Sequence, residues 1–329
     1  MSSLPDTFVK GFHNEDDIKL MEYRTFGKTG LKVSKLSIGG GPFGACYGAI
    51  SEAEAINTIV TALKKGVNYI DTAPYYGQGK SEELIGRALK NVPRQAYYIA
   101  TKIGRYEKTF ADMFDFSAKK TKESVEKSLK LLGLDYIDVL QIHDIEFAPN
   151  LEIILRETLP AVEQLRQEGK IKYIGVSAYP VDILKKMISL APGRFDTVLC
   201  YARYTLLDDT LLEYIPFFRE NNLALICASV HALGLLTNTG PQPWHPGVQE
   251  VKEVSAKAAD LCKANNVDLS KLAMYYASLL DGPATFLTGV QNLDQFNMNM
   301  DAILKGLSEK EEEILKKLQK TVFTKSMNW

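Results

Sequence analysis

The chain has few of the residues that build disulfide frameworks and metal sites. Its 329 residues include four cysteines and four histidines. The cysteines lie far apart, at Cys46, Cys200, Cys227 and Cys262. No spacing of these residues matches a zinc site, and nothing indicates paired cysteines. We therefore expect no bound metal, free thiols and a reducing compartment, with the cytoplasm as the default.

An excess of charge is also missing, and so are long apolar runs. The chain has 39 basic and 40 acidic residues, for a formal net charge of -1. This balance gives no general attraction to nucleic acid or to an anionic membrane. No apolar run approaches the ~20 residues that span a bilayer. The first residues lack the basic and apolar regions of a secretory signal.

What the chain does contain is an alternation of short apolar runs and amphipathic segments. The runs are continuously apolar, as is typical of parallel strands buried on both faces. We expect strands at 33–39, 67–71, 97–102, 136–143, 171–176, 195–200, 223–228 and 284–287. We expect helices at 51–65, 81–90, 117–132, before 169, and at 181–190, 208–220, 251–265, 269–280, 293–304 and 308–318.

Eight strands with helices between them favour closure into a (β/α)₈ barrel. A doubly wound dinucleotide-binding sheet would carry G-x-G-x-x-G after its first strand, and the spacing in 39–44 is wrong for it. We expect one domain over 21–329, with a β-hairpin at 23–33 closing one end and extra helices at its C-terminal end. Residues 1–20 are polar and aperiodic, and we expect them to form an extension outside this domain.

Four titratable residues stand at or just after the ends of consecutive expected strands: Asp71, Tyr76, Lys102 and His143. The carboxyl ends of barrel strands meet at one face, so these side chains can converge. An ammonium lowers the pKa of a neighbouring phenol, a carboxylate holds the ammonium, and an imidazole can bond a substrate oxygen. Each residue alone has a commoner structural explanation. Together they suit carbonyl–alcohol interconversion with a hydride-carrying cofactor.

These residues and their surroundings resemble the aldo-keto reductase superfamily. The matching segments are 71–77, 79–82, 101–102, 140–143, 175–177 and 234–237, within a resemblance over about residues 21 to 320. The resemblance implies a (β/α)₈ barrel and a nicotinamide dinucleotide bound without a Rossmann domain. It also implies a catalytic tetrad. In this tetrad Tyr76 is the general acid/base and Lys102 tunes it. Asp71 pairs with Lys102, and His143 orients the substrate.

Within the superfamily, the chain is similar to the L-galactose dehydrogenases and related aldose 1-dehydrogenases. The resemblance is carried by 228–229, 234–237 and the segment Gly240–Pro246, which is rich in Pro and contains Trp244. It implies oxidation of the anomeric hydroxyl of a free sugar to a lactone. We expect this loop to lie over the barrel mouth and Trp244 and Tyr75 to border the sugar pocket. The alternative is a rigid surface loop.

The resemblance also implies a set of cofactor-binding residues. They are Gly40, Asp71, Ser177, Tyr201, Ser229, Gly234, Gly289, Gln295 and Asn299. Two departures concern the carboxamide: Ala178 stands in place of a common Asn, and Tyr201 in place of a common Gln. Ala228 stands in place of a Tyr that often stacks on the nicotinamide. We therefore expect this ring to be held differently, by Tyr201 or through a water.

The segment Gly289–Asn299 bears on the choice between NAD and NADP. NADP-preferring relatives place a basic residue here, whereas this segment has Gln295 and no Lys or Arg. A 2′-phosphate without a cation would lose strong charge-assisted hydrogen bonds. We expect a preference for NAD, with NADP as the alternative.

Two other functions stay open at this point. One is a general aldehyde and ketone reductase that uses NADPH. The other is a regulatory subunit that binds the cofactor and serves a partner, which would show negligible turnover. We expect a small sugar or carbonyl substrate, no nucleic acid or membrane partner, and a monomer or weak homodimer.

Overall fold

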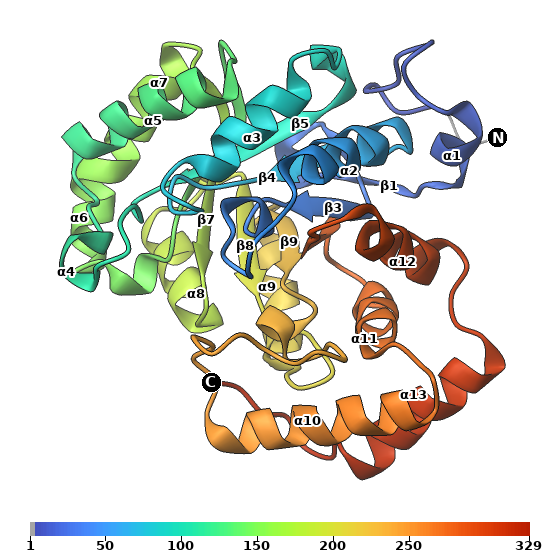
Figure 1. The fold of residues 1–329 in the computed structure, drawn as a ribbon. Helices are drawn as coiled ribbons and strands as arrows, with labels where there is room; N and C mark the ends of the chain where they lie inside the picture. The colour runs from blue at the N-terminus through green and yellow to red at the C-terminus, as the bar shows by residue number, and fades with distance from the viewer. Residues whose placement is uncertain (1–3) are drawn as a thin grey trace.

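A closed barrel of eight parallel strands forms the centre of the molecule in a computed structural model that describes residues 4–329 (Figure 1). Neighbouring strands follow chain order, and the last strand closes the ring against the first. The strands are β3 (Leu36–Gly39), β4 (Tyr69–Asp71), β5 (Tyr98–Ile103), β6 (Ile137–Ile142), β7 (Ile171–Ala178), β8 (Thr197–Tyr201), β9 (Ala224–Ala228) and β10 (Thr285–Gly289). The predicted (β/α)₈ barrel is confirmed.

The hairpin before the barrel is also present. Strand β1 (Tyr23–Thr25) pairs antiparallel with β2 (Lys32–Ser34), and the short helix η1 (Gly27–Thr29) lies between them. The predicted strand 33–39 is therefore divided, because residues up to Ser34 belong to the hairpin and β3 begins at Leu36. Phe26 is buried with its ring centre 5.3 Å from that of Tyr69 in β4. The hairpin thus covers the amino end of the barrel.

Helices surround the strands, and good capping residues fix several of their ends. The helices between strands are α2 (Glu52–Lys64), α3 (Lys80–Leu89), α4 (Phe110–Met113), α5 (Ala118–Leu132), α6 (Leu151–Ile153), α7 (Leu159–Gln167), α8 (Val181–Leu190), α9 (Ile215–Glu220), α10 (Gln249–Ala264) and α11 (Leu269–Ser278). The Ser51 side chain accepts a hydrogen bond from the backbone N–H of Glu54 at the start of α2. Gly133 ends α5 in the left-handed conformation that glycine tolerates best.

The C-terminal helices build a second apolar core beside the barrel. Helices α10 and α13 (Glu309–Thr321) lie side by side below the barrel in Figure 1. Both contribute buried residues to one cluster, among them Ala258 from α10 and Leu318 from α13. Helix α12 (Leu293–Leu304) follows β10 and contacts α11 and α2. These additions correspond to the predicted extra helices.

The N-terminal segment differs from the aperiodic extension that we expected. Residues 1–3 lie outside the described residues, but Glu15–Leu20 form helix α1, which begins after the N-cap Asn14. Ile18 is buried, and the Asn68 side chain donates a hydrogen bond of 3.1 Å to the hydroxyl of Thr7. Residues 4–20 therefore pack against the amino end of the barrel. The domain boundary at residue 21 stays a prediction.

Within residues 4–329, no helix is both long and apolar enough to cross a membrane. The same part of the chain contains no group of three or more His, Cys, Asp or Glu residues arranged to hold a metal ion. All four cysteines are free thiols, and three of them are buried.

Candidate active site

The four predicted tetrad residues come from neighbouring strands at the carboxyl end of the barrel. Asp71 ends β4, Lys102 lies near the end of β5, and His143 directly follows β6. Tyr76 lies in the loop between β4 and α3. Lys102 stands opposite Gln141 in the β5–β6 register. The parallel register therefore brings residues that are up to 72 positions apart in the sequence to one face.

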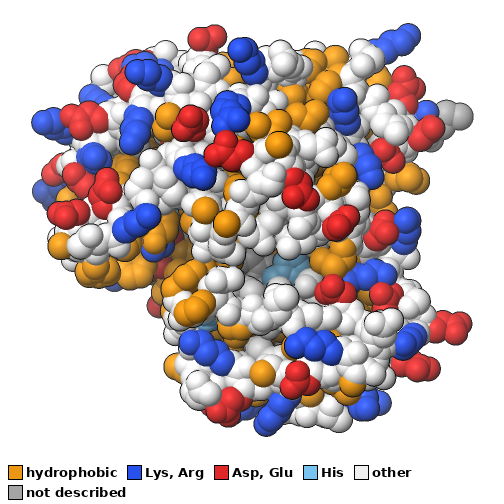
Figure 2. Space-filling model, in the orientation of Figure 1, with side chains coloured by type: hydrophobic (Ala, Val, Ile, Leu, Met, Phe, Trp, Pro, Cys, Tyr) orange, Lys and Arg blue, Asp and Glu red, His pale blue; other side chains and the backbone are white. Residues whose placement is uncertain are grey.

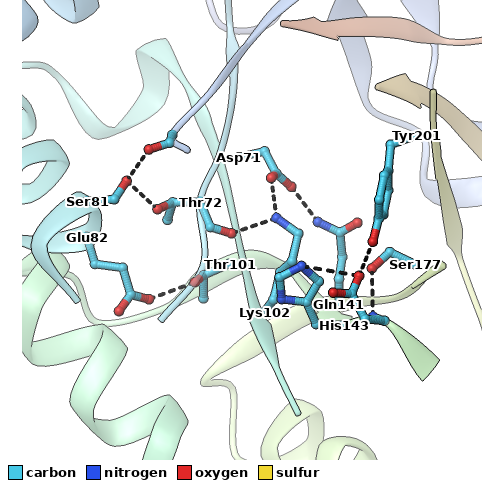
Figure 3. Close-up of polar contacts among 12 residues, drawn as sticks. Asp71, Thr72, Ser81, Glu82, Thr101, Lys102, Gln141, His143, Ser177 and Tyr201 are labelled. Atoms are coloured by element: carbon cyan, nitrogen blue, oxygen red, sulfur yellow. Dashed lines mark hydrogen bonds and ion pairs between the residues drawn. The ribbon is translucent and has the colours of Figure 1, made fainter. Parts of the chain in front are cut away.

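A buried ion pair between Asp71 and Lys102 forms the floor of the site (Figure 3). The Lys102 ammonium donates to Asp71 Oδ1 and, at 2.8 Å, to the backbone carbonyl of Thr72. The second carboxylate oxygen of Asp71 accepts from the side-chain amide of Gln141 at 2.5 Å. Burial raises the pKa of Asp71, and the Lys102 charge opposes that shift. Because both partners are almost fully enclosed, removing either would leave an uncompensated buried charge.

Gln141 was not among the predicted site residues. It lies within the apolar run of β6 and is fully buried. Its position two residues before His143, as the one polar residue in the run 139–142, is the signal that could have identified it.

Tyr76 lies beside both Lys102 and His143. The Lys102 ammonium is 5.1 Å from the centre of the Tyr76 ring, and the His143 ring centre is 6.0 Å away at an interplanar angle of 89°. Burial raises the pKa of Tyr76 well above its usual value, and the charges of Asp71 and Asp144 add to the shift. The expected role of Lys102 in tuning the pKa of Tyr76 stays a prediction.

His143 is a neutral imidazole in this environment. Burial lowers its pKa to about 3, although the neighbouring Asp144 carboxylate acts in the opposite direction. Its Nδ1 atom is buried and has no hydrogen-bond partner within the described residues. A neutral ring of this kind suits a hydrogen bond to a reacting oxygen better than a charge-stabilising role.

A buried carboxylate, Asp144, and a half-buried guanidinium, Arg105, lie next to the tetrad and were also missed. Arg105 donates to Asp144 Oδ2 at 2.6 Å, and the hydroxyl of Tyr201 donates to Asp144 Oδ1. The Arg105 guanidinium lies 3.8 Å from the centre of the Tyr75 ring. The signal in the sequence is weak: Arg105 and Asp144 are close in the chain to Lys102 and His143, but nothing shows that they meet.

Two loops at the strand ends contain candidate cofactor residues. The backbone N–H of Gly40 donates to the carbonyl of Asp71 at 2.6 Å, and a Cβ at Gly40 would lie 2.6 Å from the Ser81 hydroxyl. After β9, four residues have left-handed backbone: Ser229, Ala232, Leu233 and Gly234. Left-handed non-glycine residues cost free energy and are concentrated at functional sites. Consecutive backbone N–H groups in such turns can also form an anion-binding concavity.

Residues predicted for the adenosine end lie on β10 and α12. Asn299 is buried, its side-chain amide donates to the Thr288 hydroxyl at 3.0 Å, and its Oδ1 has no partner within the described residues. The Gln295 Oε1 accepts from the backbone N–H of Gln291 at 2.8 Å. A Cβ at Gly289 would lie 2.8 Å from the Pro42 ring.

Helix α12 also contacts a basic residue from another element. Lys65, which directly follows α2, donates to the Asn297 Oδ1 at 3.2 Å. The prediction about NAD considered only 289–299 and could not include this lysine.

Trp244 and Tyr75 lie at the rim rather than among the buried tetrad contacts. Trp244 is 50% exposed, and its indole N–H donates to the backbone carbonyl of Cys46 at 3.0 Å. The 240–247 loop is thereby joined to the loop after β3. Figure 2 shows a recess near the middle of this face, between the barrel and α10. The contact of Trp244 and Tyr75 with a substrate stays a prediction, as do the roles of the other site residues.

The fold and the four converging side chains are those of a barrel oxidoreductase. Comparison with known proteins supports this class directly. A sequence model described as "Aldo/keto reductase family" matches residues 35–320. The chain belongs to the aldo-keto reductase family, and it is an oxidoreductase. Enzymes of this family use NAD or NADP.

The relatives include two sugar dehydrogenases. L-galactose dehydrogenase from Arabidopsis thaliana is 40% identical over 286 residues, which cover 86% of this chain and 88% of that protein. D-arabinose 1-dehydrogenase from Saccharomyces cerevisiae is 33% identical over 316 residues, which cover 90% and 92%. Among solved structures, the holo form of an aldo-keto reductase from Bacillus halodurans has a TM-score of 0.70 and 29% identity. That match covers 91% of this chain and 96% of the other.

Proposed function

We propose that this protein is an aldose 1-dehydrogenase that uses NAD to oxidise the C1 hydroxyl of an L-galactose-like sugar to a lactone. The observation that carries the proposal is the similarity, over most of the chain, to two enzymes named as dehydrogenases of L-galactose and D-arabinose. The convergence of Asp71, Tyr76 and Lys102 with His143 supports it, because these side chains suit proton transfer at a carbonyl or hydroxyl oxygen.

The residues at the barrel mouth fit a nicotinamide dinucleotide. The left-handed turn at 229–234 would bind the phosphates through backbone N–H groups. Asn299, whose buried Oδ1 has no partner in the part of the chain that the structure describes, would hold the adenosine end together with Gln295. A bound oxidised nicotinamide would supply a hydride acceptor for C1 and a positive charge that favours the Tyr76 phenolate.

In the proposed reaction Tyr76 is the general base. The O–H bond of the sugar breaks and its proton passes to the Tyr76 phenolate oxygen. Lys102, held by Asp71, keeps a positive charge near the phenol ring, while neutral His143 bonds the reacting oxygen. Because burial raises the pKa of Tyr76 in the protein alone, its phenolate would form only when positive charge is added beside it. The same groups would run in reverse for carbonyl reduction, with Tyr76 as the acid.

The preference for NAD rests on the absence of Lys and Arg from 289–299 and on Gln295, which bonds the Gln291 backbone. One observation favours the alternative, an NADPH-dependent carbonyl reductase. Lys65 reaches α12 through Asn297 and could offer a cation to a 2′-phosphate.

The test is a panel of free aldoses, including L-galactose and D-arabinose, with NAD and with NADP. A matched set of simple aldehydes is tested with NADH and NADPH. Turnover is followed by nicotinamide absorbance and lactone formation. We expect kcat/KM for sugar oxidation with NAD to exceed that for aldehyde reduction with NADPH. The reverse order would establish the carbonyl reductase. Negligible turnover of every pair with a tightly retained cofactor would indicate the regulatory subunit.

A further inference from the structure

The buried carboxylate of Asp144 has no part in the tetrad described above. It directly follows His143, is fully enclosed, and has left-handed backbone with φ 53° and ψ 55°. A non-glycine residue in this conformation is held there at a cost by its surroundings. This cost indicates that Asp144, a buried carboxylate next to a candidate catalytic histidine, has a specific role.

The contacts of Asp144 show which groups hold it. Oδ2 accepts from Arg105, and Oδ1 accepts from the Tyr201 hydroxyl. The same Oδ1 lies 3.5 Å from His143 Nε2. The backbone N–H of Asp144 donates to the Ser177 hydroxyl at 3.4 Å. Residues of β5, β7, β8 and their following loops thus surround this one carboxylate.

The position of Asp144 Oδ1, 3.5 Å from His143 Nε2, bears on which ring nitrogen carries the histidine proton. Burial alone would raise the pKa of Asp144, but the Arg105 charge and the hydrogen bond from Tyr201 lower it, so the carboxylate is ionised. A bare Nε2 would direct its lone pair at an anionic oxygen, whereas an Nε2–H is attracted to it. Since the ring is neutral, it carries only one N–H. Nδ1, which has no hydrogen-bond partner among residues 4–329, is then the unprotonated nitrogen.

The same carboxylate also links the two loops that carry the catalytic candidates. Arg105 connects Asp144, the neighbour of His143, to Tyr75, the neighbour of Tyr76. We propose that Asp144 is a positioning residue that fixes the His143 proton on Nε2 and, through Arg105, holds the Tyr75–Tyr76 loop in place. This inference rests on the proposed role of His143 at the reacting oxygen.

The tautomer can be read directly in the unsubstituted protein. The chain has four histidines, so ¹⁵N-histidine labelling gives few signals, and His143→Gln identifies the one from His143. We expect ¹⁵N shifts of a neutral ring protonated at Nε2 at neutral pH. A ring protonated at Nδ1, or an imidazolium, would overturn the proposal. This measurement needs no substrate, so it stands even if sugar oxidation is not found.

The substitution Asp144→Asn tests the consequence. An amide has one oxygen, which the Arg105 guanidinium needs as an acceptor. The NH₂ group then replaces Oδ1 beside His143 Nε2 and moves the ring proton to Nδ1. We expect this tautomer shift and a fall in kcat of roughly tenfold or more. The rate is measured with whichever substrate the wild-type enzyme turns over fastest. An unchanged kcat with an unchanged tautomer would refute the role.

Asp138→Asn is the matched control. Asp138 is also a buried carboxylate on β6 that pairs with an arginine, Arg94, at 2.5 Å, but it lies at the amino end of the strand. Its loss should lower stability while leaving the His143 tautomer and kcat within about twofold of wild type. If Asp138→Asn reduced kcat as much as Asp144→Asn, the effect would be a general loss of packing and the positioning role would be rejected.

Discussion

Tyr76 shares its immediate surroundings with a lysine that is already paired. Lys102 bonds Asp71 and the Thr72 carbonyl, while burial and the charges of Asp71 and Asp144 raise the pKa of the phenol. The pKa of Tyr76 is therefore high in the protein alone, and the group starts out as a hydrogen-bond donor. In the proposed reaction, proton release by Tyr76 would therefore depend on the positive charge of a bound cofactor.

Removing the Tyr76 hydroxyl should stop the reaction without weakening the cofactor complex. We expect Tyr76→Phe to lower kcat by at least about 10²-fold, because the phenol acts on the substrate proton, with little change in dinucleotide Kd. Tyr75→Phe is the control, since it keeps the ring on which Arg105 stacks and should retain most of the activity. A Tyr76→Phe enzyme that keeps more than a few per cent of kcat would show that another group transfers the proton.

Glu146 offers a stability test that depends on pH. Burial and the Asp144 charge raise its pKa from 4.5 to about 7. A carboxyl group whose pKa is higher in the folded than in the unfolded protein stabilises the fold at pH values below its unfolded pKa. This stabilisation is lost as the pH rises through its folded pKa. Relative to wild type, Glu146→Gln should therefore gain stability between pH 4.5 and about 7, by at most about 3 kcal/mol.

Urea unfolding of the wild-type protein and of Glu146→Gln across this pH range measures the difference. A difference in the free energy of unfolding that does not change with pH would show that Glu146 titrates normally.

At the level of elements, the turn that carries Tyr76 is held by the loop after β3. Gly44 ends the short helix η2 (Pro42–Gly44), and a Cβ there would lie 2.4 Å from the carbonyl carbon of Tyr76. The clash would be with backbone atoms of Tyr76, so no movement of a side chain can relieve it. The loop therefore requires glycine at this position for reasons of space, and any larger residue must displace the catalytic turn.

We expect Gly44→Ala to reduce kcat by roughly 10- to 100-fold, since a displacement of about 1 Å can have that effect. Gly41→Ala is the control in the same loop, because its Cβ would meet the Tyr47 ring at an ordinary 3.5 Å. Steady-state kinetics with circular dichroism separate misplacement from unfolding. Equal losses in both variants would mean that the loop as a whole, not the contact with Tyr76, limits activity.

The sequence allowed the strands to be predicted, but not which polar side chains pair with one another at the site. Parallel strands buried on both faces read as continuous apolar runs, so all eight were found, and Ser51 and Gly133 marked helix ends correctly. Helix α1 was missed because six residues with one buried side chain leave no periodic pattern. The pairing of Arg105 with Asp144 and of Gln141 with Asp71 depends on the barrel register, which no local pattern contains.

Across the whole molecule, the segments that cover the barrel and the candidate catalytic residues lie at opposite ends of it. The hairpin and residues 4–20 cover the amino end, whereas the tetrad lies at the carboxyl end. Ile18 of α1 is buried beside Gly66, just before β4. Substitutions at this end should change the free energy of unfolding and leave the site intact.

Ile18→Ala should lower the free energy of unfolding by about 2–4 kcal/mol through the cavity it leaves. Its kcat should stay within about twofold of wild type below the melting temperature. Denaturant unfolding and steady-state kinetics on the same preparation give both quantities. A large loss of kcat without a loss of stability would show that α1 influences the site from a distance.

The enclosure of the Asp71–Lys102 pair has a consequence for the ionic strength that the enzyme tolerates. Mobile ions reach charges at a protein surface and weaken their interactions within a Debye length of about 10 Å at 0.1 M salt, but they screen buried pairs far less. Both members of this pair are at most 2% exposed. Added salt should therefore weaken the capture of an anionic cofactor at the rim and leave the proton-transfer machinery at the strand ends almost unaffected.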